Sequence, residues 1–469
     1  MGGFVSFVGA GPGDVGLLTE KGRQCLEKAE VVLYDRLANP RLLRYTKANC
    51  QLIYCGKLPD RHVMRQEKIN DTLIEMALAG KRVVRLKGGD PSVFGRVGEE
   101  AEAARNEGID YEIVPGVTSS IAAASYAGMP VTHRDYSASF TLRTGHSCQE
   151  NELKTHSDDE LGDTIAYYMG VKNLYHHCQV LINKGFPPET KVAVIEWATT
   201  GKQRTVEGTL LTISDEVKAN NIQNPAMTII GDVVALRQKL AWFEKKRMFG
   251  KRLLIAKASA EESKLERYFL NEGGEAYAFP TLKTEKKSIS SHELKQIRLA
   301  EKLVFLSPES VTILIDSLLA HGYDIRDLPR QVYSLSEKTK KALLSIGIRS
   351  EKITEPSNEM IKVGYVNKPI SAEDNSKLIT THHLQIDDRF EVIDKRLLNE
   401  ETWETVVFPS QSSVDWFLTA LKSYGYRDNW IKTISFAYIG QRVKAYAEEK
   451  GFTKIDEEVQ RELALGYWK

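Results

Sequence analysis

Hydrophobic residues in the first half of the chain gather in short runs that alternate with longer amphipathic stretches. Short runs rich in β-branched residues predict strands, and the amphipathic stretches between them predict helices. Such alternation favours a parallel α/β architecture. The strands predicted from this pattern are Val5–Val8, Val31–Tyr34, Arg82–Leu86, Tyr111–Val114, Phe140–Arg143, Thr164–Tyr168, Val192–Trp197 and Met227–Ile230.

Three of these strands end in loops of glycine and other turn-forming residues, namely Gly9–Gly13, Gly88–Pro91 and Pro115–Thr118. Ligands of open α/β sheets bind at the carboxyl ends of the strands, so the three loops predict one ligand site. Further along, the segment Gly128–Pro130 predicts a break between two lobes.

Glycine content and charge place a domain boundary near the middle of the chain. Of the 33 glycines, 23 precede residue 245, and the charged run Glu244–Arg247 and Gly250 then precede a new apolar run. We therefore predict one domain over residues 1–245, with lobes of about 1–130 and 131–245, and another over 250–469.

The second half contains an internal repeat, because the pattern Val-Phe-x-Ser-x-x-Ser-Val at residues 304–311 recurs at residues 407–414. Each copy is typical of a strand, a turn and a helix that the serine caps. Two similar α/β lobes facing a cleft would carry such a repeat. So would any duplicated α/β domain in which Ser307 and Ser410 are only structural caps.

Composition excludes several classes of protein. A hydrophobic content of 42% and a charged content of 27% exclude a disordered chain, and a formal net charge of +1 argues against a nucleic-acid binder. No stretch is long and apolar enough to predict a membrane span. The five cysteines form no CxxC pair, so we expect reduced thiols in the cytoplasm and no structural zinc site. The side chains of the adjacent pairs His176-His177 and His382-His383 point apart on a helix or strand. We therefore expect these histidines to be structural or surface residues, with no metal site.

The spacing Gly9-x-Gly11-x-Gly13, with Asp35 at the end of the next strand, first suggests a dinucleotide site. The fit is poor, because Pro12 interrupts the loop where the dinucleotide motif needs the start of a helix.

The ordered set of segments decides between these readings. Gly9–Asp14, Leu33–Leu37, Leu86–Gly95, Val114–Ser119, Thr132–Asp135 and Tyr168–Val171 follow one another along the chain. Together they resemble the tetrapyrrole methylases, and among these the uroporphyrinogen-III C-methyltransferases, over roughly residues 3–243. The resemblance implies a two-lobed α/β fold that binds S-adenosyl-methionine between its lobes and forms a homodimer through this half.

The same resemblance implies particular site residues. The cofactor neighbours it implies are Pro12, Gly88, Gly89, Asp90, Val93, Thr118, Ser119, Met169, Ala198 and Ala226. Glycines let backbone amides approach the methionine carboxylate, Asp90 would lie near the sulfonium or amine, and Met169 would pack on an adenine for which the two alanines leave room. Asp35 is implied as a proton acceptor and Lys57 as a proton donor. The alternatives are a strand-end cap or an ion pair with Arg36 for Asp35, and a solvated loop lysine for Lys57.

Uroporphyrinogen carries acetate and propionate groups, so its pocket needs cations. Arginine offers forked donors that suit carboxylates. The candidates near the motif loops are Arg36, Arg61, His62, Arg65, Arg85, Lys87, Arg96, His133, Arg134, Arg143 and His146.

The second half resembles the uroporphyrinogen-III synthases, over roughly residues 250–469. The residues that carry this resemblance are Gly250–Ile255, the two serine turns, Ser336-x-x-Thr339 and Gly440–Arg442. It implies a middle lobe of about 285–390 and another lobe of 250–280 plus 395–469, joined by a two-stranded ladder near Phe279–Thr284 and Val392–Lys395. The family usually has a functional tyrosine in the second ladder strand, where this chain has Ile393-Asp394-Lys395.

The two resemblances together imply a fused enzyme of early sirohaem and cobalamin synthesis. The second half would close hydroxymethylbilane to uroporphyrinogen III, and the first half would methylate that product twice to give precorrin-2. Three alternatives stay open: a methylase of a later corrin intermediate, a C-terminal half that is a non-catalytic anion-binding or docking module, and a nicotinamide dehydrogenase.

Overall fold

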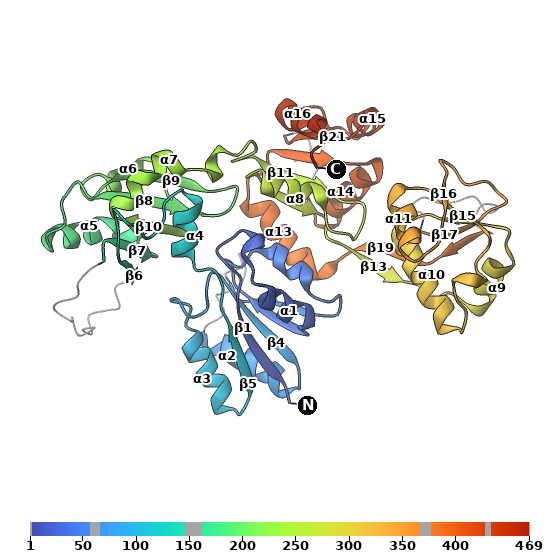
Figure 1. The fold of residues 1–469 in the computed structure, drawn as a ribbon, viewed down its shortest axis with the longest axis horizontal. Coiled ribbons are helices and arrows are strands. Elements are labelled where there is room, and N and C mark those ends of the chain that lie inside the picture. The colour runs from blue at the N-terminus through green and yellow to red at the C-terminus, as the bar shows by residue number, and fades with distance from the viewer. Residues whose placement is uncertain (1, 57–65, 146–161, 366–376, 427–432, 469) are drawn as a thin grey trace.

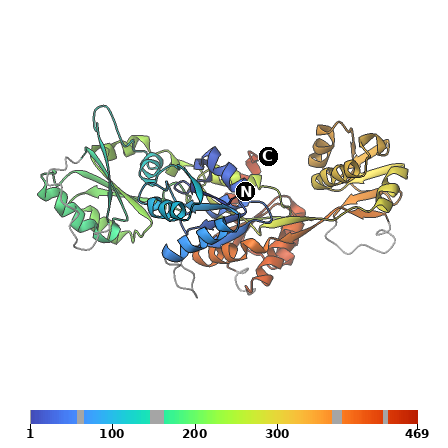
Figure 2. The same ribbon diagram turned by 90° about the horizontal axis from the view of Figure 1, so that it is seen from below.

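The computed structural model describes residues 2–56, 66–145, 162–365, 377–426 and 433–468. Within these ranges the chain forms four larger sheets and a two-stranded ladder. Figure 1 shows the first sheet in blue, the second in green, the ladder leading to a lobe in yellow and orange, and the remaining sheet between them. Seen from below in Figure 2, the yellow lobe lies apart from the rest, at the end of the ladder.

The first sheet is parallel throughout, with the strand order β3-β2-β4-β1-β5. Its strands are β1 (Phe4–Gly9), β2 (Val31–Tyr34), β3 (Gln51–Tyr54), β4 (Arg82–Lys87) and β5 (Asp110–Val114). Helix α1 (Glu20–Lys28) and the 3-10 segment η2 (Pro40–Tyr45) cover one face, and α2 (Gln66–Leu78) and α3 (Val97–Asn106) cover the other. Because β4, β1 and β5 are neighbours, the three glycine loops leave the sheet side by side.

The second sheet has the order β6-β7-β10-β8-β9. Its strands are β6 (Phe140–Thr144), β7 (Thr164–Tyr168), β8 (Lys191–Glu196), β9 (Arg204–Thr209) and β10 (Ala226–Ile230). Helix α4 (Ser119–Tyr126) packs on one face, and α5 (Leu174–Asn183) and α6 (Ile213–Ala219) pack on the other. Beyond β10 the chain continues through η4 (Asp232–Leu236), α7 (Arg237–Leu240) and η5 (Phe243–Lys245) into the second half.

The prediction of a parallel sheet is wrong for this second lobe. Only β6 and β7 run parallel in it, whereas β10 runs antiparallel to β7 and β8, and β9 runs antiparallel to β8. The sequence pattern missed β9 and β3 because each lies at a sheet edge and is partly exposed, so neither shows a continuous apolar run.

The second half contains two further parallel sheets. The sheet with the order β12-β11-β20-β21 consists of β11 (Arg252–Ala256), β12 (Glu275–Phe279), β20 (Thr405–Phe408) and β21 (Ser435–Tyr438). Its helices are α13 (Glu391–Glu400), α14 (Gln411–Ser423) and α15 (Gln441–Glu449) on one face, and α8 (Lys264–Asn271) and α16 (Glu457–Leu465) on the other.

The other sheet has the order β16-β15-β14-β17-β18. Its strands are β14 (Lys302–Phe305), β15 (Gln331–Ser334), β16 (Glu351–Lys352), β17 (Ile361–Gly364) and β18 (Leu378–Thr380). Helices α9 (Ser291–Leu299), α10 (Pro308–Ala320) and α11 (Glu337–Ser345) contribute to its core. The remaining 3-10 segments are η1 (Val15–Leu17), η3 (Val171–Asn173), η6 (Ile325–Asp327) and η7 (Asp388–Phe390).

The repeat in this half corresponds to equivalent elements of the two sheets. Ser307 follows β14 and caps α10, and Ser410 follows β20 and caps α14. In each case the hydroxyl of this serine accepts from the amide of the serine three residues later, and the hydroxyl of that later serine accepts from the amide of the first. The serines therefore cap helices, as the sequence predicted, and this role alone explains why the pattern recurs.

The two lobes of the second half are joined by an antiparallel ladder of β13 (Leu282–Lys286) and β19 (His382–Ile386). The predicted second ladder strand, Val392–Lys395, is wrong, because these residues lie in α13, with Ile393 buried and Val392 exposed as on one amphipathic helix. The observed second ladder strand, β19, also contains no tyrosine. The chain therefore still departs from the synthase pattern, but at other residues than those predicted.

No helix within the described ranges combines the length and apolar character that crossing a bilayer requires.

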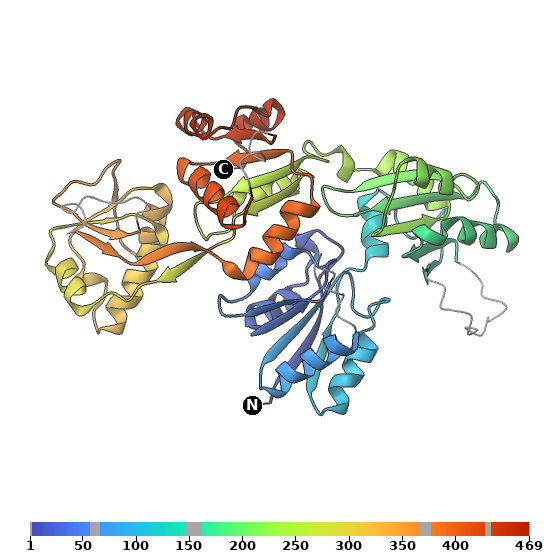
Figure 3. The ribbon, with the colours of Figure 1, turned by 180° about the vertical axis from the view of Figure 1, so that it is seen from behind.

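Helix α13 lies between the two halves, and Figure 3 shows it in orange above the blue sheet.

Candidate functional site

The three glycine loops of the first lobe pack directly on one another. Gly11 and Gly89 exchange backbone hydrogen bonds, with N···O distances of 3.2 and 2.7 Å. A Cβ on Gly116 would overlap the Gly89 carbonyl oxygen and lie 2.9 Å from the Gly9 Cα. These approaches leave no room for side chains, which explains the glycines at all three strand ends.

The loop that follows β8 in the second lobe lies against the first of these glycine loops. The amide of Asp14 donates to Thr199 Oγ1 at 3.0 Å. A Cβ on Gly13 would lie 2.7 Å from Thr200 Cγ2 and 3.2 Å from the Ala198 carbonyl oxygen. The predicted cofactor neighbours Pro12 and Ala198 are thereby brought to facing loops of the two lobes.

A second contact joins the lobes at the start of α4. The Thr118 hydroxyl lies 2.5 Å from the Tyr168 hydroxyl, and Tyr168 donates to Ser120 Oγ at 2.8 Å. Tyr168 ends β7, so Met169 follows at the same edge, 40% exposed and with a φ of 55°. The register of β10 against β7 and β8 places Ala226 at this edge too.

Asp90 connects two of the glycine loops. Its Oδ2 accepts from the Gly116 amide at 2.9 Å and its Oδ1 from the Ser92 amide at 2.7 Å. The half-buried Val93 follows in the same turn, where its amide donates to the Asp90 carbonyl at 3.2 Å. Asp90 therefore has a structural task besides the cofactor contact predicted for it, and that contact stays a prediction.

Asp35, at the end of β2, belongs to a buried group of charges. Its Oδ2 pairs with Arg85 Nη2 at 3.1 Å, while its Oδ1 is buried and has no hydrogen-bond partner among the residues that the structure describes. Glu100 Oε1 in turn accepts from Arg85 Nε at 3.3 Å and from Lys87 Nζ at 2.8 Å. Burial and the nearby Arg85 lower the pKa of Lys87. The ion pair with Arg36 considered for Asp35 is not formed, because Arg36 pairs with Glu400 at 3.6 Å.

The predicted substrate cations are only partly supported by their surroundings. Arg85 and Lys87 are buried in ion pairs, so their expected role in holding substrate carboxylates is wrong. Arg96 pairs with Glu99, whereas Arg134 is exposed beside the half-buried His133. The proton donor candidate Lys57 and the cation candidates Arg61, His62, Arg65 and His146 lie outside the described residues.

A cleft of about 300 Å³ lies between the two lobes of the second half. The lobe of β11 and β20 contributes Ala258, Ser259, Glu261, Ser412 and Trp416, and the other lobe and the ladder contribute Leu306, Ser307, Pro308, Glu309, Lys338, Tyr365, His382 and Leu384. Lys338 Nζ and Glu261 Oε2 form an ion pair at 2.7 Å across it. His382 also lines the cleft, so its interpretation as a structural or surface residue is incomplete.

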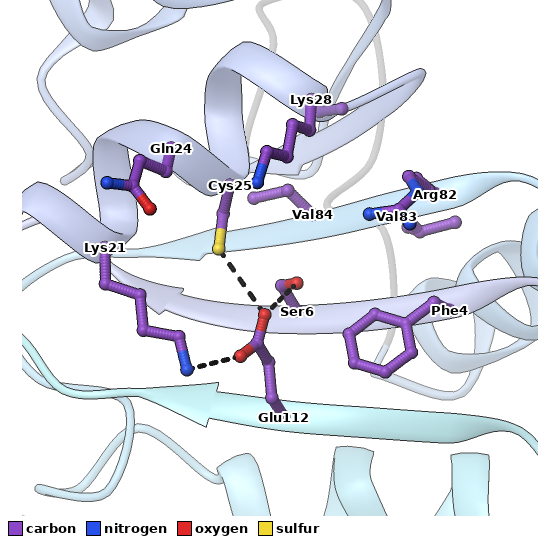
Figure 4. A pocket seen from close by; sticks show the side chains of 11 residues that line it. Phe4, Ser6, Lys21, Gln24, Cys25, Lys28, Arg82, Val83, Val84 and Glu112 are labelled. Carbon is purple, nitrogen blue, oxygen red and sulfur yellow. Dashed lines mark hydrogen bonds and ion pairs between the residues drawn. The ribbon is translucent and has the colours of Figure 1, made fainter.

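A separate cavity of about 240 Å³ lies between α1 and strands β1, β4 and β5, away from the loops just described (Figure 4). Glu112 accepts there from Ser6 at 3.0 Å and Cys25 at 3.5 Å, and pairs with Lys21 at 2.6 Å. These bonds connect α1 to the sheet, and the cavity contains none of the predicted site residues.

Sequence reasoning missed the residues that hold the lobes together. Tyr168 was included in a motif but not given a role, and Thr199 was not singled out. The one available signal was position, because both residues stand at the ends of predicted strands. Lys338 and Glu261 carried no signal, since exposed charges on helices and loops are common.

The chain matches two family models. Residues 5–214 match the model of tetrapyrrole (corrin/porphyrin) methylases, and residues 263–363 match that of uroporphyrinogen-III synthase HemD. Two long relatives span both halves. A uroporphyrinogen-III C-methyltransferase of Bacillus subtilis (strain 168) is 42% identical over 90% of this chain and 88% of that protein. The porphyrin biosynthesis protein HemD of Ruminiclostridium josui is 32% identical over 90% of this chain and 89% of its own.

A shorter relative matches the first half alone. The uroporphyrinogen-III C-methyltransferase of Priestia megaterium is 54% identical over 50% of this chain and 98% of its own length. A solved structure of uroporphyrin-III C-methyl transferase from Thermus thermophilus, complexed with S-adenyl homocysteine, is 36% identical over 50% of this chain and 100% of that chain, with a TM-score of 0.43.

Proposed function

Since this chain belongs to the tetrapyrrole methylase family and carries a second half of the uroporphyrinogen-III synthase type, we propose that it methylates uroporphyrinogen III twice, to precorrin-2, with S-adenosyl-methionine as donor. The observation that supports this most is the meeting of the two lobes at Asp14–Thr199 and Thr118–Tyr168. Five of the ten predicted cofactor neighbours belong to these contacts or lie within two residues of them, namely Pro12, Thr118, Ser119, Met169 and Ala198.

The residues at this meeting point suit a methyl donor with a carboxylate, an amine and an adenine. Gly89, with a φ of 67°, exposes backbone groups at a position where a side chain would be strained. Thr118 precedes α4 without a side-chain capping bond, and the Ser120 amide donates to the Tyr168 hydroxyl at 3.3 Å, so the start of this helix is held beside the end of β7. S-adenosyl-methionine supplies an electrophilic methyl group when bound.

Asp35 fits the task of handling a substrate proton. One of its carboxylate oxygens is fixed by Arg85, and the other, Oδ1, has no partner in the described residues. An oriented carboxylate with a vacant acceptor atom could hold a pyrrole N–H or take a proton from the ring. Lys57 stays a proposal from resemblance alone.

We further propose that the second half closes hydroxymethylbilane to uroporphyrinogen III in the cleft between its lobes. The substrate is a chain of carboxylate-bearing rings, and Lys338 and His382 line the cleft that would hold it. Inverting the last ring is mainly a task of holding that chain in one shape. Tyr365 lines the cleft, so it is our candidate for the role of the tyrosine absent from the ladder, whereas Tyr438, at the end of β21, does not line it.

The methylation proposal is tested with the full chain, uroporphyrinogen III and S-adenosyl-methionine, by following mass. Two added methyl groups are expected, and none with Gly89→Val, which places a β-branched residue at a positive φ. A chain that binds the donor but methylates only a later corrin would contradict the proposed substrate. Light scattering of the same preparation tests the homodimer that the resemblance implies.

The synthase proposal is tested with fresh hydroxymethylbilane and the full chain, without the methyl donor. Predominance of the type III isomer is expected. If only the type I isomer forms, at the rate seen in buffer, the second half is a non-catalytic docking module.

A further inference from the structure

The two halves of the chain meet behind the proposed cofactor site through a junction of charged residues. Glu275, at the start of β12 in the second half, pairs with Arg41 Nη2 of η2 at 2.8 Å. Glu266 of α8 pairs with Arg41 at 3.3 Å and with Arg44 at 2.7 Å. The side chains of Arg41, Glu266 and Glu275 are each at most 9% exposed, so these pairs are shielded from solvent.

From η2 a short path leads to the first cofactor loop. Asn39 caps η2 by accepting from the Arg41 amide at 3.0 Å, and its Nδ2 donates to the Gly13 carbonyl at 2.6 Å. The segment η2, which packs on the first sheet and pairs with the second half, is thus bonded to the loop that contains Pro12.

The same part of the second half also contacts the loop of the other lobe. A Cβ on Gly201 would overlap the amide nitrogen of Glu275, so this loop lies directly on the backbone of the second half. Lys202 pairs with Glu401, just after α13, at 2.6 Å, with both side chains largely buried. Gln203 accepts from the Thr199 amide at 2.9 Å and donates at 2.8 Å to Glu244 in the connection between the halves.

The start of β12 thus touches both lobes of the first half at once, through the Glu275 side chain on one and its backbone on the other. The two loops it supports are those joined by the Asp14–Thr199 hydrogen bond. We propose that the second half positions these loops, so that affinity for the methyl donor depends on the junction between the halves. The proposal rests on the proposed function, because it assigns Arg41, Glu275 and Gly201 as positioning residues of that cofactor site.

The test is Gly201→Ala in the full chain. It adds one methyl group against the Glu275 backbone, changes no charge, and stands at a position without a positive φ. Gly98→Ala in α3 is the matched control, because a Cβ there meets nothing within 4 Å. Affinity for S-adenosyl-homocysteine, measured by titration calorimetry, does not depend on turnover.

We expect Gly201→Ala to weaken binding at least about tenfold, as misplaced binding groups do, with Gly98→Ala unchanged. In turnover, KM for S-adenosyl-methionine should rise while KM for uroporphyrinogen III stays near that of the wild type, a split that general destabilisation would not produce. Wild-type affinity in a folded Gly201→Ala chain overturns the proposal.

A second variant serves if Gly201→Ala does not fold. Arg41→Met combined with Glu275→Gln removes both members of an ion pair, so neither charge is left buried alone, and Glu266 keeps Arg44. Weaker binding by this variant supports the proposal, and unchanged binding overturns it. Failure of the wild-type chain to bind the probe would instead contradict the proposed function, and the positioning role with it.

Discussion

Both halves of this chain build a site between two α/β lobes, but they hold the lobes together differently. In the first half, loops of the two lobes bond directly, at Asp14–Thr199 and Thr118–Tyr168. In the second half, the lobes are connected by the ladder of β13 and β19, and the ion pair of Lys338 with Glu261 across the cleft is exposed. Where few contacts cross between lobes, relative motion is the default expectation.

This difference indicates which of the two sites has a fixed shape before its ligand binds. The first half holds its loops at backbone contact distance, which suits a small donor bound in one pose. The second half has a wide cleft lined by side chains from both lobes, which suits a long, flexible substrate that the lobes enclose. We expect substitutions to act steeply in the first site and gradually in the second.

The largest effect on donor affinity is expected for Gly116→Ala. The added Cβ would overlap the Gly89 carbonyl oxygen, and no flexible side chain is there to move aside. Affinity for S-adenosyl-homocysteine should fall by more than about 100-fold, while ring closure by the second half is unchanged. Calorimetry beside the Gly98→Ala control measures this, and wild-type affinity in a folded variant would show that the loops are not rigid.

Asp35→Asn should come next. The substitution keeps the size of the side chain but removes its basicity, so turnover of uroporphyrinogen III should fall roughly 10²- to 10⁴-fold with donor affinity near that of the wild type. Steady-state kinetics and calorimetry on the same preparation separate the two quantities. Equal loss of donor affinity would place Asp35 in the cofactor site instead.

A buried carboxyl group of the second half should make the stability of the protein depend on pH. Asp394 accepts from the hydroxyls of Tyr277 at 2.7 Å and Tyr424 at 3.1 Å. Burial raises the pKa of Asp394 to about 6 from an ordinary 3.8, although the two tyrosine hydrogen bonds and the nearby Arg44 lower it.

A carboxyl whose pKa is raised in the folded state stabilises that state at low pH. The free energy of unfolding should therefore fall by up to about 3 kcal/mol as the pH rises from about 4 to about 6. Asp394→Asn should remove this dependence. Urea unfolding at several pH values compares the two chains, and parallel curves would refute the assignment to Asp394.

The smallest effect is expected for Lys338→Met. The ion pair with Glu261 is solvent-exposed, so the free energy of unfolding should change by less than about 1 kcal/mol. KM for hydroxymethylbilane should rise several-fold, because the cleft loses a cation. Lys340→Met on the same helix is the control, since Lys340 is exposed and does not line the cleft. Equal KM values for the two variants would exclude Lys338 from substrate binding.

The two halves also differ in how much of their structure could be predicted from the sequence. Backbone contacts require glycine at Gly9 and Gly116, a positive φ favours it at Gly89, and these requirements leave a pattern that can be recognised in the sequence. Buried strands such as β2 and β7 were predicted residue by residue, because a fully buried strand is a continuous apolar run.

What the sequence did not reveal depends on tertiary contacts. The ladder strand β19 has only five residues, and its alternation of polar and apolar residues is too short to predict a strand. The resemblance to the synthases implied a strand at Val392–Lys395 instead, and these residues lie in α13. The ion pair that buries Arg85 joins residues 50 positions apart, and no local pattern distinguishes it from a free substrate-binding cation.

Supplying the full chain with hydroxymethylbilane and S-adenosyl-methionine together, with no added uroporphyrinogen III, tests most directly whether the two halves perform consecutive steps. We predict a dimethylated product of the type III isomer series, formed with no other enzyme present. Unmethylated type I uroporphyrinogen, formed at the rate of buffer alone by a chain that still methylates added uroporphyrinogen III, would contradict this and leave the second half without a catalytic role.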